Sequence, residues 1–325
     1  MATPRAERPE PTLGIVGLGL VGRALAGRLI DAGYAVAGCD IAVQSAAQAA
    51  LLGVRIVDDA AELATQCQVL VVCVFDDAQF AAVVAAVTGA VAAVAADPDP
   101  RAAPPADPLA DPMADPSAGA RVLINTSTCS PAVVDAMLPL LIRHGIDFIE
   151  LPLSGSSAQI RDGNALALLG GDAAAIGRWQ PVLDCLGPNQ SRVGPPGTAA
   201  RVKLASNLIL GLNRAALAEG LALAEALGLD GDDFLALLRR SPAYSRAVDT
   251  VGDRMVARDF RPLSRLAQHR KDLALIVAQG DALGQPLPLA RAHAALLDHA
   301  LALGHGELDN AAVFAALRPD SPPPR

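Results

Sequence analysis

The chain has 325 residues, of which 52% are hydrophobic and 18% are charged, and its formal net charge is −8. A chain of this length can bury the cores of two globular domains. The acidic balance argues against a basic face for nucleic acid or anionic membranes, and 3% aromatic residues are too few for base stacking.

The sequence predicts neither a signal peptide nor a membrane span. The N-terminus lacks an apolar segment, and no run of about 18 apolar residues is free of charged or turn residues. The five cysteines include no CxxC pair, which favours reduced thiols. We therefore expect a cytoplasmic protein with no nucleic-acid or membrane partner.

Short apolar runs alternate with Ala-rich segments of helical length from residue 13 to about residue 170. Fully apolar strands separated by helices indicate βαβ units in a mostly parallel sheet. We predict a flexible N-terminus at 1–12, followed by a doubly wound α/β domain of the Rossmann type over 13–195. The predicted strands are 13–16, 35–39, 69–74, 121–125, 148–150 and 165–169.

The alternation is interrupted at residues 89–119, where five Asp-Pro pairs occur. Proline disfavours helix and ladder strand, so this segment predicts a disordered insertion. From residue 196 to residue 318 we predict an all-helical C-terminal domain, with a flexible tail at 319–325. Its predicted helices are 199–228, 231–240, 243–257, 264–283 and 288–303.

Residues 13–40 contain a glycine motif between two predicted strands. The run Gly17-Leu18-Gly19-Leu20-Val21-Gly22 follows the first strand, and Asp40 ends the second, 18 residues after Gly22. Glycines at this spacing permit a tight turn and close approach of a pyrophosphate to a helix N-terminus, while the acid accepts a ribose hydroxyl. No arginine follows Asp40 to hold a 2′-phosphate, so we expect NAD rather than NADP.

Lys203 and Lys271 are the only lysines in the chain. Arginine can replace lysine as a point charge but cannot give up a proton near neutral pH, so both positions are candidates for chemistry. Lys203 and Asn207 are four residues apart and share one face of a predicted helix.

Four further motifs follow one another in a specific order. They are Ser127-Thr128-Cys-Ser-Pro131, Glu150-Leu-Pro-Leu-Ser-Gly-Ser, Gly197 with Lys203 and Asn207, and Lys271-Asp272-Leu273. With these residues the chain resembles the β-hydroxyacid dehydrogenase family of the 6-phosphogluconate dehydrogenase superfamily, which includes 3-hydroxyisobutyrate, tartronate-semialdehyde and L-threonate dehydrogenases. The resemblance covers nearly everything except the Asp-Pro-rich segment.

The resemblance implies an NAD-linked oxidoreductase that interconverts a small 3-hydroxy acid and its semialdehyde or keto form. It implies that Lys203 transfers the hydroxyl proton and that Asn207 positions the substrate or the lysine. The substrate carboxylate is expected at Ser154 and at the amides of Gly155 and Ser156, where the family usually has glycine in place of Ser156. The remaining residues implied at the cofactor are Val74, Phe75, Thr128 and Lys271. A homodimer or homotetramer is also implied.

Two other functions stay open on the same sequence. Imine reductases share the fold but generally lack the lysine, and a non-catalytic NAD-binding protein would most simply have lost Lys203 or the glycines. The five histidines show no metal-ligand spacing, so no metal site is expected. Asp76 and Asp77 follow a predicted strand directly, which favours a helix N-terminus over a catalytic carboxylate pair.

Overall fold

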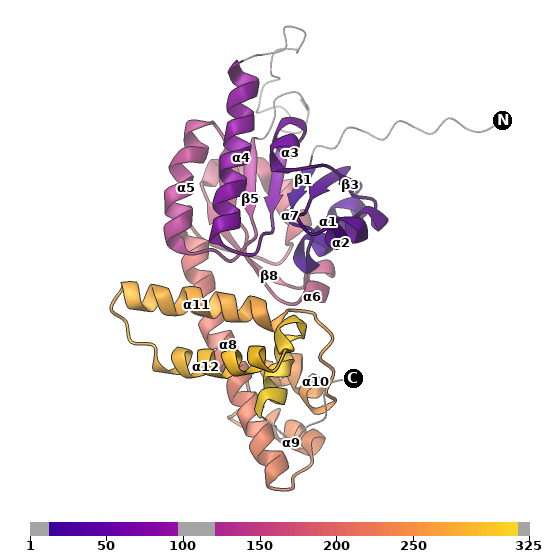
Figure 1. Cartoon of the computed structure of the whole chain (residues 1–325), viewed down its shortest axis with the longest axis vertical. Coiled ribbons are helices and arrows are strands. Elements are labelled where there is room, and N and C mark those ends of the chain that lie inside the picture. The colour runs from indigo at the N-terminus through magenta and orange to yellow at the C-terminus, as the bar shows by residue number, and fades with distance from the viewer. Residues whose placement is uncertain (1–12, 97–120, 318–325) are drawn as a thin grey trace, which may run out of the picture. The chain divides into compact units, whose positions relative to one another are not determined.

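The computed structural model describes residues 13–96 and 121–317. The chain divides into two compact units, residues 1–203 and residues 204–325, which are described separately. The first is built around a sheet and the second from helices (Figure 1). The predicted class, a Rossmann-type α/β domain followed by an all-helical one, is confirmed.

The sheet of the first unit has the strand order β3-β2-β1-β4-β5-β6-β8-β7, with β9 paired to β8. The pairs from β3 through β6 are parallel, whereas β8 runs antiparallel to β6 and β7. The first six strands therefore have the Rossmann order. The strands are β1 (Leu13–Val16), β2 (Val36–Cys39), β3 (Arg55–Ile56), β4 (Val69–Val72), β5 (Val122–Asn125), β6 (Asp147–Glu150), β7 (Leu153–Ser154), β8 (Leu166–Gly171) and β9 (Gln190–Gly194).

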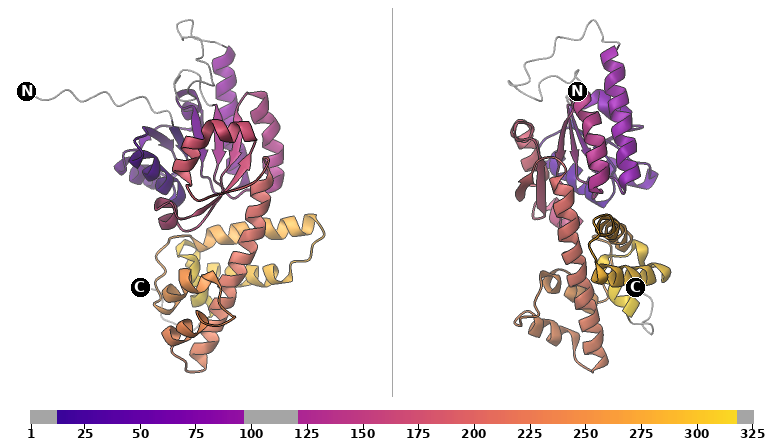
Figure 2. Two further views of the ribbon diagram at one scale, coloured as in Figure 1. Left: turned by 180° about the vertical axis from the view of Figure 1, so that it is seen from behind. Right: turned by 90° about the vertical axis from the view of Figure 1, so that its left-hand side faces the viewer.

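Helices cover both faces of this sheet because alternate strand residues point to opposite sides. Leu13 and Ile15 of β1 enter a core formed with helices α1, α6 and α7, whereas Val16 enters a core formed with α3, α4 and α5. The side view in Figure 2 shows the strands between these layers. The helices are α1 (Leu20–Asp31), α2 (Val43–Leu51), α3 (Ala60–Gln66), α4 (Asp77–Ala96), α5 (Pro131–Arg143), α6 (Ser157–Arg161) and α7 (Ala173–Leu186).

Helix α4 corrects the expected start of the insertion. It continues through residues 89–96, where the disordered insertion was expected to begin, because the Ala- and Val-rich sequence extends the helix at the small cost of one glycine. The Asp-Pro pairs themselves lie outside the described residues.

By length and composition α4 could also cross a membrane. Phe80, Val84 and Val87 of this helix are fully buried within the first unit.

The N-terminus of α4 agrees with the helix-cap interpretation of the two aspartates. The Asp76 carboxylate accepts a hydrogen bond of 2.8 Å from the Gln79 amide, and Asp77 is the first helical residue. A carboxylate at this end satisfies an amide that has no partner within the helix.

The second unit contains helices packed around one apolar core. The predicted helix at 243–257 begins later than expected. Residues 243–245 belong to the turn and loop after Pro242, and the helical residues from 246 onward include a π-helical turn and the short α10. The elements are α8 (Thr198–Ala226), α9 (Gly231–Leu238), η2 (Val248–Gly252), α10 (Asp253–Val256), α11 (Leu266–Ala282), α12 (Pro288–Ala302), η3 (His305–Glu307) and η4 (Asn310–Leu317).

Two histidines from different helices meet inside this unit. The rings of His269 on α11 and His293 on α12 have centroids 5.1 Å apart. They pack against Gly211 of α8, where an added Cβ would lie 2.6 Å from the His269 ring. His293 is 4% exposed, and its burial, together with the charge of Arg214, lowers its pKa to about 4.

This burial predicts acid sensitivity of the helical unit. When the pKa of a histidine is lower in the folded state than its usual value near 6.5, the histidine contributes its full share to the free energy of unfolding above pH 6.5. That contribution is lost as the pH falls toward 4. The loss expected from His293 reaches about 3 kcal/mol at pH 4. Denaturant unfolding between pH 7 and pH 4 measures it. His293→Phe should flatten this slope and His299→Phe, at an exposed position of the same helix, should not. Equal slopes in all three proteins would contradict the prediction.

Candidate active site

The turn between β1 and α1 requires glycine at two of its three motif positions. Gly17 has φ +91°, and a Cβ there would lie 2.3 Å from the Cys73 carbonyl oxygen. A Cβ at Gly22 would lie 1.9 Å from the Gly17 oxygen. Gly19 differs, because a Cβ there would meet nothing within 4 Å. The protein therefore leaves open the space that the middle glycine faces.

The residues around this turn fit a dinucleotide. No side chain caps helix α1 at Gly19. The amides of its first turn, beginning with those of Leu20 and Val21, therefore form a helix N-terminus that is suited to bind an anion. The Asp40 carboxylate accepts the Leu18 amide at 2.6 Å and the Ala42 amide at 2.7 Å, which fixes it beside the turn. Ile41 and Val43 next to it are more than four-fifths exposed and offer an apolar surface.

Hydrogen bonds join the loops that follow β4 and β5. The Val74 amide donates to the Ser127 hydroxyl at 2.9 Å, and the Ser127 amide donates to Asn125 Oδ1 at 3.0 Å. These bonds bring Val74 and Phe75 close to the loop that carries Thr128. Phe75 is 44% exposed, so its ring is accessible to a ligand.

A buried carboxylate ties the end of β6 to the first turn of α8. Glu150 is 2% exposed, and it accepts hydrogen bonds from the amides of Gly197 and, at 2.8 Å, Ala200. Burial raises the pKa of Glu150, while these backbone donors oppose the rise. The bonds satisfy amides that lack partners at a helix N-terminus.

Lys203 reaches the loop that follows β6. Its Nζ donates to the Leu153 carbonyl oxygen at 2.7 Å, and the side chain is 6% exposed. Leu153 directly precedes Ser154. The structure therefore brings together, within the first unit, the lysine and the loop that the sequence assigned to the substrate.

Two hydrogen bonds join Ser156 and Gln159 in the segment that follows Ser154. The Ser156 amide donates to Gln159 Oε1 at 2.8 Å, and the Gln159 amide donates to Ser156 Oγ at 3.2 Å. This reciprocal pair is a capping box at the start of α6. Helix α6 is held to α1 by an ion pair of 2.6 Å between Arg161 and Asp31.

Asn207 has a partner that the sequence did not predict. Its Nδ2 donates to Asp272 Oδ2 at 3.1 Å, while Lys271 Nζ lies 2.7 Å from Asp272 Oδ1. Asn207 Oδ1 is buried and has no hydrogen-bond partner within residues 13–96 and 121–317. Because a carboxylate can only accept hydrogen bonds, the nitrogen of the Asn207 side chain must be the end that faces Asp272. Lys203 and Asn207 lie one turn apart on α8.

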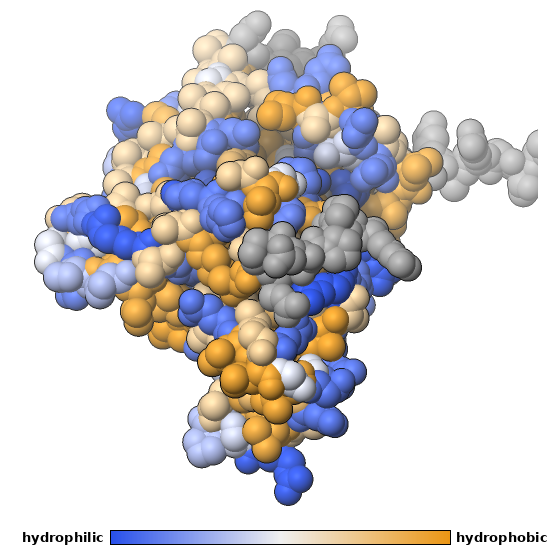
Figure 3. Space-filling model, turned by 60° about the horizontal axis from the view of Figure 1, so that its bottom comes forward, coloured by the Kyte–Doolittle hydropathy of each residue, from blue (hydrophilic) through white to orange (hydrophobic). Residues whose placement is uncertain are grey.

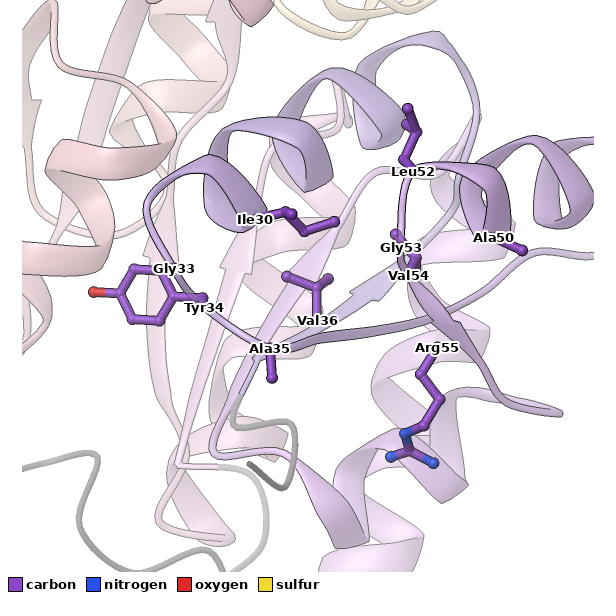
Figure 4. A pocket seen from close by; sticks show the side chains of 10 residues that line it. All are labelled: Ile30, Gly33, Tyr34, Ala35, Val36, Ala50, Leu52, Gly53, Val54 and Arg55. Carbon is purple, nitrogen blue, oxygen red and sulfur yellow. The ribbon is translucent and has the colours of Figure 1, made fainter. Parts of the chain in front are cut away.

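One surface hollow lies away from these residues. It measures about 590 Å³ and is lined by Ile30, Val36 and Leu52, among others (Figure 4). It adjoins the amino end of β2, whereas Asp40 follows the carboxyl end, where ligands of such sheets bind. Within the described residues, no three His, Cys, Asp or Glu side chains are grouped to hold a metal ion.

The contacts made by Gln159, Asp272 and Glu150 were not predicted, and only the first of them had a readable signal. Ser156 and Gln159 form the S-x-x-Q signature of a capping box, which predicts their pairing. Asp272 lies inside a recognised motif, but its bond to Asn207 joins positions 65 residues apart. The hydrogen bonds from Gly197 and Ala200 to Glu150 join positions 47 and 50 residues apart.

Two family models match the chain. Residues 12–99 and 104–194 match the NAD binding domain of 6-phosphogluconate dehydrogenase. Residues 197–317 match the model described as NAD-binding of NADP-dependent 3-hydroxyisobutyrate dehydrogenase. Both models name a nicotinamide dinucleotide, in agreement with the fit of the glycine turn.

Individual proteins are also similar to the chain. 2-Hydroxy-3-oxopropionate reductase of Escherichia coli is 31% identical over 62% of this chain and 69% of its own length. Cytokine-like nuclear factor N-PAC of Aedes aegypti is 31% identical over 55% of this chain, but only 32% of its own length. The crystal structure of a 3-hydroxyisobutyrate dehydrogenase from Salmonella typhimurium superposes with a TM-score of 0.76 at 26% identity, covering 93% of this chain and 98% of that one. The chain therefore belongs to the β-hydroxyacid dehydrogenase family of NAD(P)-binding oxidoreductases.

Proposed function

We propose that the protein is an NAD-dependent dehydrogenase that interconverts a small 3-hydroxy acid and its semialdehyde or keto form. One observation supports this above the others. Lys203, on a helix anchored by Glu150, places its ammonium 2.7 Å from the Leu153 carbonyl, beside Ser154. This arrangement joins an acid–base group to a loop suited to a carboxylate. When bound, NAD supplies the hydride acceptor.

Lys203 acts at the reacting oxygen. In the oxidation direction its neutral amine takes the hydroxyl proton and becomes an ammonium, and in reduction that ammonium returns the proton to the same oxygen. Its positive charge also stabilises the alkoxide that develops there. The Leu153 carbonyl holds the amine in place, since an acceptor at 2.7 Å restricts a long and flexible side chain.

Asn207 presents an acceptor one turn further along α8. Asp272 binds its Nδ2, so Oδ1 remains to accept a hydrogen bond from the substrate hydroxyl or from the Lys203 ammonium. Asp272 is thus a positioning residue for Asn207. Lys271 neutralises the Asp272 carboxylate and, with Val74, Phe75 and Thr128, is proposed to contact the cofactor.

Self-association fits the exposed surface of the helical unit. Ile209, Leu223 and Leu227 of this unit are each more than 60% exposed, and apolar patches are visible on the molecular surface (Figure 3). Burial of such side chains between copies would be favourable, which supports a homodimer or homotetramer. The small carboxylate substrate and a cytoplasmic location belong to the same proposal.

A substrate panel tests the function. Purified protein is mixed with NAD and a series of 3-hydroxy acids, and the near-ultraviolet absorbance of the reduced cofactor is followed. Reduction of cyclic imines with NADH in a parallel series would favour an imine reductase instead. Binding of NAD without turnover of either series would favour a non-catalytic protein.

The glycine turn predicts different outcomes for two similar substitutions. Gly22→Ala forces a Cβ against the Gly17 oxygen, and we expect Tm to fall by roughly 3–10 °C. Gly19→Ala meets open space at a φ of −64° that alanine accepts, so Tm should be unchanged. Its Cβ should instead obstruct the pyrophosphate and weaken NAD binding by about tenfold or more. Calorimetry of unfolding and of NAD binding measures both, and full NAD affinity in Gly19→Ala would argue against this site.

Asp40 predicts a preference for NAD. Its carboxylate accepts ribose hydroxyls and repels a 2′-phosphate. Asp40→Ala should lower the ratio of kcat/KM for NAD to that for NADP by about tenfold or more, since a hydrogen bond to a charged group is lost. A higher kcat/KM for NADP in the unaltered protein would overturn the assignment.

Lys203→Arg should abolish turnover but leave NAD binding nearly intact. Arginine keeps the charge but cannot release its proton near neutral pH, and general acid–base groups contribute about 10²–10⁴-fold. Steady-state kcat and an NAD titration by fluorescence measure the two effects. A variant that retains more than about a tenth of kcat would show that Lys203 is only an electrostatic anchor.

A further inference from the structure

The Ser156 amide, one of the donors expected for the substrate carboxylate, already has an acceptor. It donates to Gln159 Oε1 at 2.8 Å. An amide N–H carries one hydrogen, so a carboxylate can use it well only by displacing the Gln159 carboxamide. The donors of this loop are therefore shared between the substrate and a side chain of the protein itself.

The surroundings hold the Gln159 carboxamide against the loop. A Cβ added at Gly155 would lie 3.2 Å from Gln159 Oε1 and 2.8 Å from the Ala165 Cβ, so the carboxamide lies beside Gly155 as well as Ser156. The other half of the capping box fixes the backbone of Gln159 at 3.2 Å from Ser156 Oγ.

Two contacts join helix α6 to helix α1. Arg161 at its end forms a 2.6 Å ion pair with Asp31, and Arg28 Nη1 donates to the Arg161 carbonyl at 3.2 Å. Both partners belong to α1, the helix that begins at the glycine turn. The short helix that carries Gln159 is thus joined to α1 at its C-terminal end.

We infer that Gln159 is a specificity-determining residue of this site. It occupies the Ser156 amide and leaves the carboxylate of a 3-hydroxy acid to Ser154 Oγ and the Gly155 amide. Small acids that depend on the loop amides for affinity, such as 3-hydroxypropionate, then bind weakly. This inference rests on the proposed dehydrogenase function.

Two substitutions at the same position should act in opposite directions. Gln159→Leu keeps the size but removes the acceptor, so the Ser156 amide becomes available and KM for 3-hydroxypropionate should fall by about tenfold. Gln159→Glu keeps the capping box and adds a negative charge beside the carboxylate, so KM should rise. In both variants kcat should change much less than KM, because Lys203 is untouched. An unchanged or higher KM in Gln159→Leu would overturn the inference.

Ser156→Ala controls for the stability of α6. It removes the Oγ half of the capping box but leaves the Ser156 amide bonded to Gln159. Its Tm should fall about as much as that of Gln159→Leu, whereas its KM should not fall. A lower KM in Ser156→Ala would attribute the effect to loosening of the helix and would contradict the role of Gln159.

A binding measurement separates this inference from the proposed function. Protein labelled with ¹⁵N-serine is titrated with 3-hydroxypropionate, and the Ser156 amide resonance is followed. It should respond strongly in Gln159→Leu and weakly in the unaltered protein, whether or not the acid is turned over. Absence of turnover with this pattern would refute the dehydrogenase proposal alone. Equal responses in the two proteins would refute the inference.

Discussion

The site of this protein depends on a carboxylate buried where strand β6 ends. Glu150 accepts amides from the first turn of α8, and this anchors the helix three residues before Lys203. An isolated buried carboxylate would be costly, and burial does raise its pKa, but the helix amides are donors that have no partner within the helix. Each group satisfies the other. The lysine and the loop beyond β6 keep a fixed distance because one side chain joins the elements that carry them.

Neighbouring side chains decide which polar atoms remain for a ligand. Asp272 takes the Nδ2 of Asn207 and leaves its Oδ1, so the amide presents an acceptor. Gln159 takes the N–H of Ser156 and removes a donor. At the turn between β1 and α1, backbone packing decides where a ligand can approach. Of the three motif glycines, only Gly19 faces open space. The donors and acceptors around Lys203 therefore depend on residues that need not touch the substrate.

Most of the fold could be predicted from the sequence because its strands are fully buried. Runs such as Val69–Val72 have no polar residue, and the helices between them leave few alternatives to a parallel sheet. The prediction missed β3 and β7, which have two residues each, and β9, whose exposed and polar residues show no strand pattern. These strands form through hydrogen bonds to a neighbour already in place. Short segments have too little apolar periodicity to be recognised alone.

The sequence by itself determined the kinds of group at the site. The glycines and Asp40 lie within one βαβ unit, and Lys203 and Asn207 lie four apart on one helix, so local geometry brings each set together. The tertiary structure decided the partners: Leu153 for Lys203, Asp272 for Asn207 and Gln159 for Ser156. The first two of these pairs join distant positions, and no local periodicity encodes them. The third is local and carries a capping signature, but its consequence appears only where the fold places that amide in the loop beside the lysine.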